Sequence, residues 1–374
     1  MVTATTSLLE AVEEIGPQFE EGAAERDSND EFVASHYAAL KERGLISALV
    51  PGEFGGGDAS FAEVAEMLRR LGYYDGPTAL ALAMHQHLVA AQVFNHHKGR
   101  PAPLLAKVGG EKLVLVSTGA RDWLESNGEA LAAEGGFRVS ARKSFASGSP
   151  VGDMVVTSAP FNDPKDGWQV LHFAVPMKSE GVSLENDWRV HGMRATGSQT
   201  VVLDSVFVPE GTIALRRPRG GFHDVFNVVI HVALPLIVSV YVGIAERAVE
   251  IATGLAKKRA GDPVVQFALG EACSAAMVAA ACQRRMVEIS DGLDFIPTME
   301  RSNEMLALKS HVVQQARRAV ECAMEASGGA GFYRSNGLER LLRDVRAGDF
   351  HPLPARQQML HTGRVALGLD PVTG

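Results

Sequence analysis

The apolar residues of this sequence change their period twice, and this order constrains the fold more than any single motif. Across residues 1–112 and 216–374 they recur at intervals of three and four, as in amphipathic helices. Between these regions, residues 113–215 hold short β-branched segments such as KLVLVST and QTVVLDSVFVPEG, separated by Gly, Asp or Pro. The sequence predicts an α+β fold with an N-terminal helical domain, a central β-barrel or β-sandwich domain and a C-terminal four-helix bundle. The bundle helices are expected near residues 222–258, 262–293, 302–327 and 336–348.

Residues 228–245, VVIHVALPLIVSVYVGIA, are long and apolar enough to resemble a membrane span. They include His231, Pro235 and Tyr241, and they continue into the amphipathic segment ERAVEIATGLAKKRA. This pattern favours a buried helix in the core of the bundle over a membrane helix.

Charge and cysteine content exclude several classes of partner. The formal net charge is −8 and no dense Lys/Arg run is present, so neither nucleic acid nor a membrane is expected as a partner. The three cysteines show no metal-ligand spacing, which predicts buried thiols and no metal site. Because no basic region followed by an apolar run is seen at the N-terminus, no secretory signal is expected and a cytoplasmic location is predicted.

Four segments, in the correct order, resemble motifs of the acyl-CoA dehydrogenase superfamily: GLISALVPGEFGGGDASFAEVAEMLRRLG, TALALAMHQHL, HGMRATGSQTVVLDSVFVPEG and SGGAGFYRSNGLERLLRDVR. The resemblance covers nearly the whole chain. It implies an FAD-binding homo-oligomer, a dimer or tetramer, with the flavin ring between the β-domain and the C-terminal bundle. It also implies a small-molecule substrate, which acyl-CoA would fit, and an electron-transfer partner or flavin reductase.

The resemblance assigns flavin contacts to residues of the β-domain. Phe145 matches the family tryptophan that packs near the isoalloxazine, Ser147 the threonine that hydrogen-bonds the ring, and Thr118 a further contact. A planar apolar wall with a hydroxyl group suits a ring that has a polar edge and a broad face. Phe145 as a core residue of the β-domain remains an alternative. The loop that follows Thr118, GARDWLESNGEA, departs from the family pattern, so it carries no predicted contact.

Two further cofactor assignments come from the helical part. Gly328, Gly329 and Gly331 match a family glycine motif whose missing side chains let a backbone approach the cofactor, although glycines of a helix-ending turn would look the same. Lys257 stands where the family has an arginine near the FAD pyrophosphate. Lysine offers a point charge instead of a bidentate fork.

The usual catalytic carboxylate is missing. The family places a glutamate eight positions after the Asp of its RD motif, and here Asp344 leads to Pro352. The alternative base position, on an early helix of the bundle, aligns near Ala233. His351 matches a histidine of the flavin-dependent hydroxylase branch that is thought to act as a base there, and ARKSFASG also resembles that branch. A structural histidine at a helix end remains the alternative for His351, and a core histidine is the expectation for His231.

Three functions follow from this resemblance. The first is an FAD-dependent oxidoreductase of acyl-CoA dehydrogenase type with a non-standard base, which oxidises an acyl thioester or a related small molecule. The second is a reduced-flavin-dependent monooxygenase that uses His351, with FMN in place of FAD. The third is a non-catalytic flavin-binding member of the family.

Overall fold

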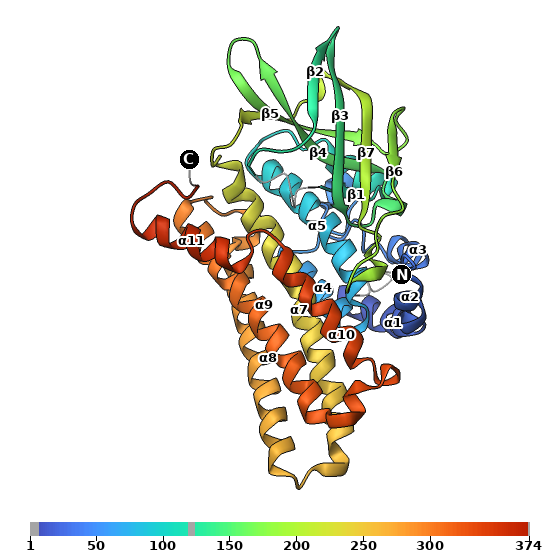
Figure 1. Cartoon of the computed structure of the whole chain (residues 1–374). Coiled ribbons are helices and arrows are strands. Elements are labelled where there is room, and N and C mark those ends of the chain that lie inside the picture. Colours follow the sequence, from blue (N-terminus) through green and yellow to red (C-terminus); the bar gives the residue numbers. More distant parts are fainter. Residues whose placement is uncertain (1–6, 119–123, 373–374) are drawn as a thin grey trace.

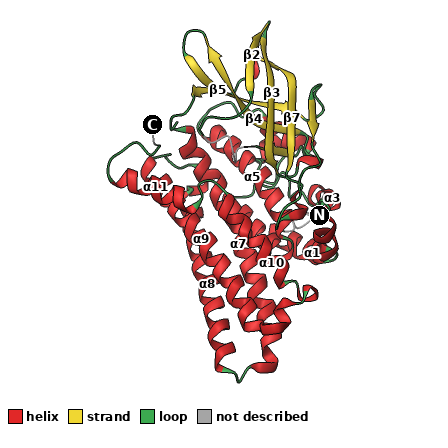
Figure 2. Ribbon diagram, viewed as in Figure 1, coloured by secondary structure: helices red, strands yellow, loops and turns green. Residues whose placement is uncertain are grey.

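The computed structural model describes residues 7–118 and 124–372 and confirms the predicted α+β fold. A helical N-terminal part and a helical C-terminal part flank a central sheet, which caps one end of a long helical bundle (Figures 1 and 2). The last helix before the sheet ends at Glu111 and the first long helix after it begins at Val225. The domain boundaries at 112/113 and 215/216 stay predictions.

The N-terminal part consists of short helices around two longer ones, α4 and α5. Helix α4 begins with a capping box, because the Glu63 amide donates to Ser60 Oγ at 3.2 Å and the Ser60 amide donates to Glu63 Oε2 at 2.8 Å. The helices are α1 Leu8–Glu20, α2 Ala23–Asn29, α3 Ala34–Glu42, α4 Phe61–Tyr74, α5 Gly76–His97 and α6 Leu104–Glu111.

The central strands form one mixed sheet in the order β6-β7-β3-β2-β4-β5-β8, with β1 parallel to β4. Strands β2 and β4 share a single residue pair, Ala130 with Phe161, so the sheet is nearly divided there into two halves. Side chains from both halves meet in one apolar core that is separate from the helical core, as in the predicted sandwich. The strands are β1 Leu115–Ser117, β2 Glu129–Ala133, β3 Gly136–Ala146, β4 Met154–Asp163, β5 Gly167–Pro176, β6 Val182–Leu184, β7 Gln199–Pro209 and β8 Leu215–Pro218.

Helix α7 is the central helix of the C-terminal part. It packs against α4 and α5 on one side and against α8 and α9 on the other (Figure 1). The fourth predicted helix, 336–348, is shorter in the structure, and a helix that the sequence did not predict follows it after a segment with two prolines. The helices are α7 Val225–Ala256, α8 Pro263–Ile289, α9 Met299–Ser327, α10 Leu338–Asp344 and α11 Ala355–Ala366.

Two helical segments, Val225–Arg259 and Pro263–Leu293, are long and apolar enough to cross a membrane by length and composition alone. The most apolar window of the first is 89% buried inside the protein, and that of the second is 33% buried. The core helix of a soluble protein passes the same test, so this is weak evidence for a membrane span. The burial of the first window agrees with the predicted core helix.

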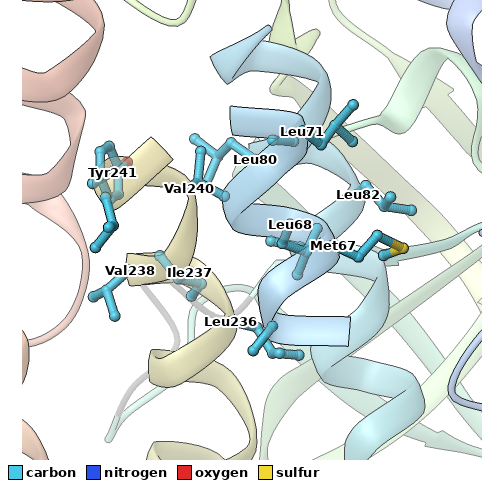
Figure 3. Close-up of a cluster of buried hydrophobic side chains, with 14 of the residues drawn as sticks. Met67, Leu68, Leu71, Leu80, Leu82, Leu236, Ile237, Val238, Val240 and Tyr241 are labelled. Carbon is cyan, nitrogen blue, oxygen red and sulfur yellow. The ribbon is translucent and has the colours of Figure 1, made fainter. Parts of the chain in front are cut away.

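Helices α4 and α7 approach so closely that two glycines are required at their crossing. A Cβ atom on Gly72 would lie 2.6 Å from the Val240 carbonyl oxygen, and one on Gly243 would collide with the Arg69 carbonyl oxygen. Apolar side chains of α4, α5 and α7 fill the space around this crossing, while Tyr241 lies on the other side of α7 (Figure 3). The crossing therefore fixes α7 against α4 through main-chain contact.

Replacing Gly243 with alanine should destabilise the protein by at least about 2 kcal/mol, because overpacking outweighs the better helix propensity of alanine. Gly254 on the same helix is a matched control, since no atom lies within 4 Å of a Cβ placed there. Gly254→Ala should stabilise the protein by up to about 1 kcal/mol. Urea unfolding followed by circular dichroism measures both, and equal free energies of unfolding for the two variants would contradict the close crossing.

Candidate active site

A cavity of about 260 Å³ lies where the sheet meets α5 and α7. The two helices contribute mainly apolar side chains, such as Met84, Leu88 and Leu234. The sheet side contributes hydroxyl groups, including those of Thr118, which follows β1, and Thr157 of β4. The segment that follows α10 closes the remaining wall. The cavity is thus apolar on its helical side and polar at the sheet, as in many small-molecule sites.

Both expected base positions face this cavity. Ala233 of α7 and Pro352 line it together, although they are far apart in the sequence. No Asp or Glu is present among the described residues of the lining. The carboxylate that would take a proton from carbon is therefore missing at the place where the resemblance puts it.

His351 lines the same cavity, beside Pro352. The Tyr241 hydroxyl lies 2.6 Å from His351 Nε2, and the Lys309 ammonium donates to the carbonyl oxygens of His351 at 2.9 Å and Leu353 at 3.2 Å. Burial lowers the pKa of His351 to about 3, with smaller contributions from Lys309 and His87. The imidazole is neutral near pH 7, and its main chain is held in place by a buried lysine.

Two other histidines in the cavity were not singled out from the sequence. His172 of β5 accepts a hydrogen bond at its Nε2 from Arg217 Nε at 3.0 Å, and burial followed by Arg217 lowers its pKa to about 3. Burial lowers the pKa of His87 on α5 to about 4, and its ring bonds no other residue in the described ranges. His85, two positions earlier, faces away and bonds Ile46 and Leu115 instead. Residues two positions apart on a helix face different sides. The spacing of His85 and His87 was therefore the signal in the sequence that their rings face different sites.

Thr118, a predicted flavin contact, lies at the polar wall of the cavity. Its hydroxyl donates to Thr157 Oγ1 at 2.7 Å, and both residues line the cavity. The loop residues 119–123 that follow lie outside the described part of the chain. A hydroxyl group at this wall fits the predicted contact with the polar edge of a flavin ring.

Phe145 and Ser147 lie close to each other but are not part of the cavity lining. A register shift between β3 and β7 at residues 143–146 re-aims Phe145, whose φ is 62°. Phe145 is 43% exposed and its ring packs edge-on against Trp188 with the ring centroids 5.7 Å apart, so the alternative of a core residue is wrong. The Ser147 hydroxyl is buried and pairs with Ser198 Oγ at 2.7 Å. An exposed aromatic face is available here for a planar ring.

The remaining cofactor candidates lie at the far end of the bundle. Lys257 follows α7 and is exposed, while Gly328 ends α9 with a φ of 57°. Arg259 links the two regions by donating to the Ala326 carbonyl oxygen at 2.7 Å. Twenty residues of helical rise separate Lys257 from Ile237 in the cavity wall, or about 30 Å. One chain therefore does not bring these residues and the cavity to the same flavin ring.

The glycines of this region fit a helix-ending turn. Gly331 is buried against Ser327 and Leu338, and a Cβ atom on Gly329 would meet open space. Their predicted contact with the cofactor stays a prediction. His231 behaves as expected of a core histidine: Nδ1 bonds the Asn227 carbonyl oxygen at 2.6 Å, and the ring stacks on Phe295 outside the cavity.

Two models of one protein family match the chain. The model described as "Acyl-CoA dehydrogenase, N-terminal domain" matches residues 8–98, and "Acyl-CoA dehydrogenase, C-terminal domain" matches residues 236–354. The chain belongs to the acyl-CoA dehydrogenase superfamily. The predicted superfamily is thereby confirmed, and with it the class of flavin-dependent oxidoreductases.

Curated relatives in this superfamily carry different activities. "Putative acyl-CoA dehydrogenase YdbM" of Bacillus subtilis (strain 168) is 27% identical over 94% of each chain. L-evernosamine nitrososynthase of Micromonospora sp. is 29% identical over 95% of this chain and 88% of its own. The oxygenase component of FADH(2)-dependent resorcinol hydroxylase from Rhizobium sp. is 27% identical over 97% and 95%. The superfamily alone therefore does not define the reaction.

A solved structure shows the same fold. KijD3, in complex with FMN and dTDP-3-amino-2,3,6-trideoxy-4-keto-3-methyl-D-glucose, superimposes with a TM-score of 0.88 at 24% identity. The match covers 100% of this chain and 96% of KijD3.

Proposed function

We propose that this protein is the oxygenase component of a reduced-flavin-dependent monooxygenase that acts on a small, largely apolar molecule. One observation carries the proposal: Ala233 and Pro352, the positions to which the resemblance assigns the superfamily base, line a cavity that holds neutral histidines and, among its described residues, no carboxylate. Oxidation of an acyl thioester needs a base strong enough to take a proton from carbon. Oxygen transfer to an electron-rich atom does not need one.

The residues around the cavity fit a flavin. The Thr118 hydroxyl, in the cavity wall, would meet the polar edge of the ring. The exposed face of Phe145, which lies outside the cavity lining, would cover part of the surface of a ring that extends beyond the cavity. When bound in its reduced form, the flavin would supply the electrons and the activation of oxygen. The relatives support both forms of the cofactor, because the resorcinol hydroxylase is FADH(2)-dependent and KijD3 holds FMN.

The distance of about 30 Å between the cavity and Lys257 bears on the choice of flavin. FMN lacks the adenosine half and needs no contact at the far end of the bundle. FAD would reach Lys257, Gly328, Gly329 and Gly331 only if a second subunit presented them. We therefore propose FMN for a single chain, and FAD for a dimer or tetramer in which subunits share the site.

The chain's own residues would bind and orient the substrate. The apolar wall formed by Met84, Leu88 and Leu234 excludes water and selects an uncharged molecule. The neutral imidazoles of His87, His172 and His351 offer hydrogen bonds without a buried charge. A phenol, an amine in its neutral form or a similar compact molecule suits such a site.

A partner and a location follow from this chemistry. The oxygenase would receive reduced flavin from an NAD(P)H-dependent flavin reductase. Cys273, Cys282 and Cys322 are free thiols, which supports a location in the reducing cytoplasm.

The second candidate is an acyl-CoA dehydrogenase with a rearranged base, which the similarity to YdbM favours. Anaerobic mixing of the oxidised flavoprotein with a panel of acyl-CoAs separates the two functions. We expect no bleaching of the flavin by any acyl-CoA. With oxygen, a flavin reductase and NADH, we expect oxygen uptake that increases when phenolic or amino substrates are added, with product detected by mass spectrometry. Bleaching by an acyl-CoA would instead establish the dehydrogenase, and failure to take up flavin would refute both enzymatic functions.

A further inference from the structure

The hydroxyl group of Tyr241 has one hydrogen-bond partner among the described residues, His351 Nε2. Tyr241 lies in the middle of α7 and is completely buried, so water does not reach its side chain. Its ring is tilted by 55° to the imidazole, with centroids 5.6 Å apart. The position of the proton in this hydrogen bond decides whether the other ring nitrogen of His351, Nδ1, is a donor or an acceptor.

Two arrangements of the proton are chemically available. In the first, Tyr241 donates to Nε2 and the imidazole carries its own proton on Nδ1. In the second, Nε2–H donates to the phenol oxygen, and the buried phenol proton is left without an acceptor among the described residues. An unsatisfied buried donor disfavours the second arrangement by roughly 5- to 150-fold. The first arrangement therefore dominates.

The groups around the pair keep both partners neutral. Burial, the Lys309 ammonium and His87 lower the pKa of His351, so the imidazolium is not formed near pH 7. Burial, with Asp344 and Asp349, raises the pKa of Tyr241 well above its usual value. Tyr241 is therefore a neutral phenol. His351 is a neutral imidazole with one ring proton, which it does not donate to any described residue.

We propose that Tyr241 is a positioning residue that holds His351 in the Nδ1–H tautomer, so that His351 offers the cavity a hydrogen-bond donor and not a basic nitrogen. The hydrogen bond of the His351 ring to the described part of the chain is made by Nε2 and not by Nδ1, and the ring lines the cavity. This changes the role expected from the sequence, in which His351 takes a proton from the substrate.

His172, which also lines the cavity, shows the same arrangement. Arginine only donates, so His172 Nε2 accepts the hydrogen bond from Arg217 Nε, and its proton lies on Nδ1. Two neutral imidazoles thus present donors to one apolar cavity. A ligand that carries acceptor oxygens, such as a carbonyl or hydroxyl compound, satisfies them. This choice of substrate class rests on the proposed function, whereas the tautomer of His351 does not.

The tautomer can be measured without any turnover. In protein labelled with ¹⁵N-histidine, long-range ¹H–¹⁵N spectra distinguish a protonated from an unprotonated ring nitrogen, and His351→Gln assigns the signals. We expect a protonated Nδ1 and an unprotonated Nε2 for His351 from pH 6 to pH 9. In Tyr241→Phe, which removes only the donor hydroxyl, we expect the two tautomers of His351 to become mixed. The wild-type spectrum alone tests the proposal, even if this variant does not fold.

Two substitutions at His351 separate the role of a donor from that of a base. The amide nitrogen of His351→Asn can occupy the place of Nδ1–H as a donor but has no basic lone pair. We expect His351→Asn to keep turnover within about tenfold of the wild type and His351→Gln, whose amide reaches the Nε2 position, to lose more than about 100-fold.

Three outcomes would overturn the proposal: a protonated Nε2 in the wild-type protein, titration of His351 with an ordinary histidine pKa, or equal loss of turnover in the two amide variants. Absence of turnover in the wild-type protein would refute the proposed function instead. It would leave the measured tautomer as a separate result.

Discussion

Replacing His351 with alanine is expected to lower turnover by about 100-fold or more while the flavin content changes by less than twofold. Removal of one positioned group for proton transfer or hydrogen bonding typically costs this much in rate. The flavin content should stay nearly unchanged, because Lys309 binds the main-chain carbonyl of residue 351 and the substitution leaves this carbonyl in place. Steady-state kinetics and the ratio of flavin to protein absorbance measure the two quantities.

His191→Ala is the matched control for this substitution, since the His191 side chain is exposed and lies outside the cavity. It should leave turnover and flavin content unchanged. Loss of the His351 ring also leaves the buried Tyr241 hydroxyl without its acceptor, which costs about 1–3 kcal/mol of stability. A parallel loss of turnover and flavin in His351→Ala would mark His351 as structural and remove it from the mechanism.

Acid should unfold this protein between about pH 5 and pH 6. Burial is the largest cause of a lowered pKa at six histidines, to about 4 or about 3: His36, His85, His87, His172, His231 and His351. Between those values and about 6.5 the unfolded chain binds more protons than the folded one, so stability falls as the pH falls. Each histidine then costs about 2 kcal/mol at pH 5, and six together approach the whole stability of a typical domain, about 5–15 kcal/mol.

One buried carboxyl opposes this trend. Burial raises the pKa of Asp344 to about 6, so the folded state binds its proton first and gains stability as the pH falls from 6 toward 3.8. A single group of this sign offsets only a small part of the histidine effect. Circular dichroism against pH, with urea unfolding at pH 7, 6 and 5.5, measures the slope.

His87→Phe tests the cause of the acid unfolding. The variant lacks one of the titrating groups, and the ring of His87 bonds no other described residue. Its free energy of unfolding should therefore fall less steeply as the pH falls, because unfolding takes up about one proton fewer. A wild-type protein that stays folded with an unchanged free energy of unfolding down to pH 4 would refute the prediction.

The architecture could be predicted well from the sequence because the features that define it are visible in short segments of the chain. The change of period at the central strands, the Ser60–Glu63 capping box and the apolar run of α7 each reflect short-range physics that a single sequence carries. The helix after Leu338 was predicted too long. Its pattern continues toward Gly348, where the chain has already passed into 3-10 turns ahead of two prolines.

The site could be predicted only where a motif fixed the register. The positions of Ala233, His351 and Pro352 followed from the resemblance, and all three line the cavity. His87 and His172 could not be found in this way, because their meeting depends on how the sheet packs against α5. The distance between Lys257 and the cavity also needed the structure, because the sequence does not show that Ile237 of α7 lines the cavity.

The glycine crossing of α4 and α7 has a consequence for redesign of the enzyme. Gly243 and Tyr241 point to opposite sides of one helical turn, so the hydroxyl that bonds His351 is placed by rigid main-chain contact. Leu88 and Ala91, on the α5 wall of the cavity, take no part in that contact. Variant libraries that enlarge or narrow the cavity at these two positions should therefore change the range of accepted molecules. The orientation of the His351 imidazole, as a hydrogen-bond donor, should stay the same.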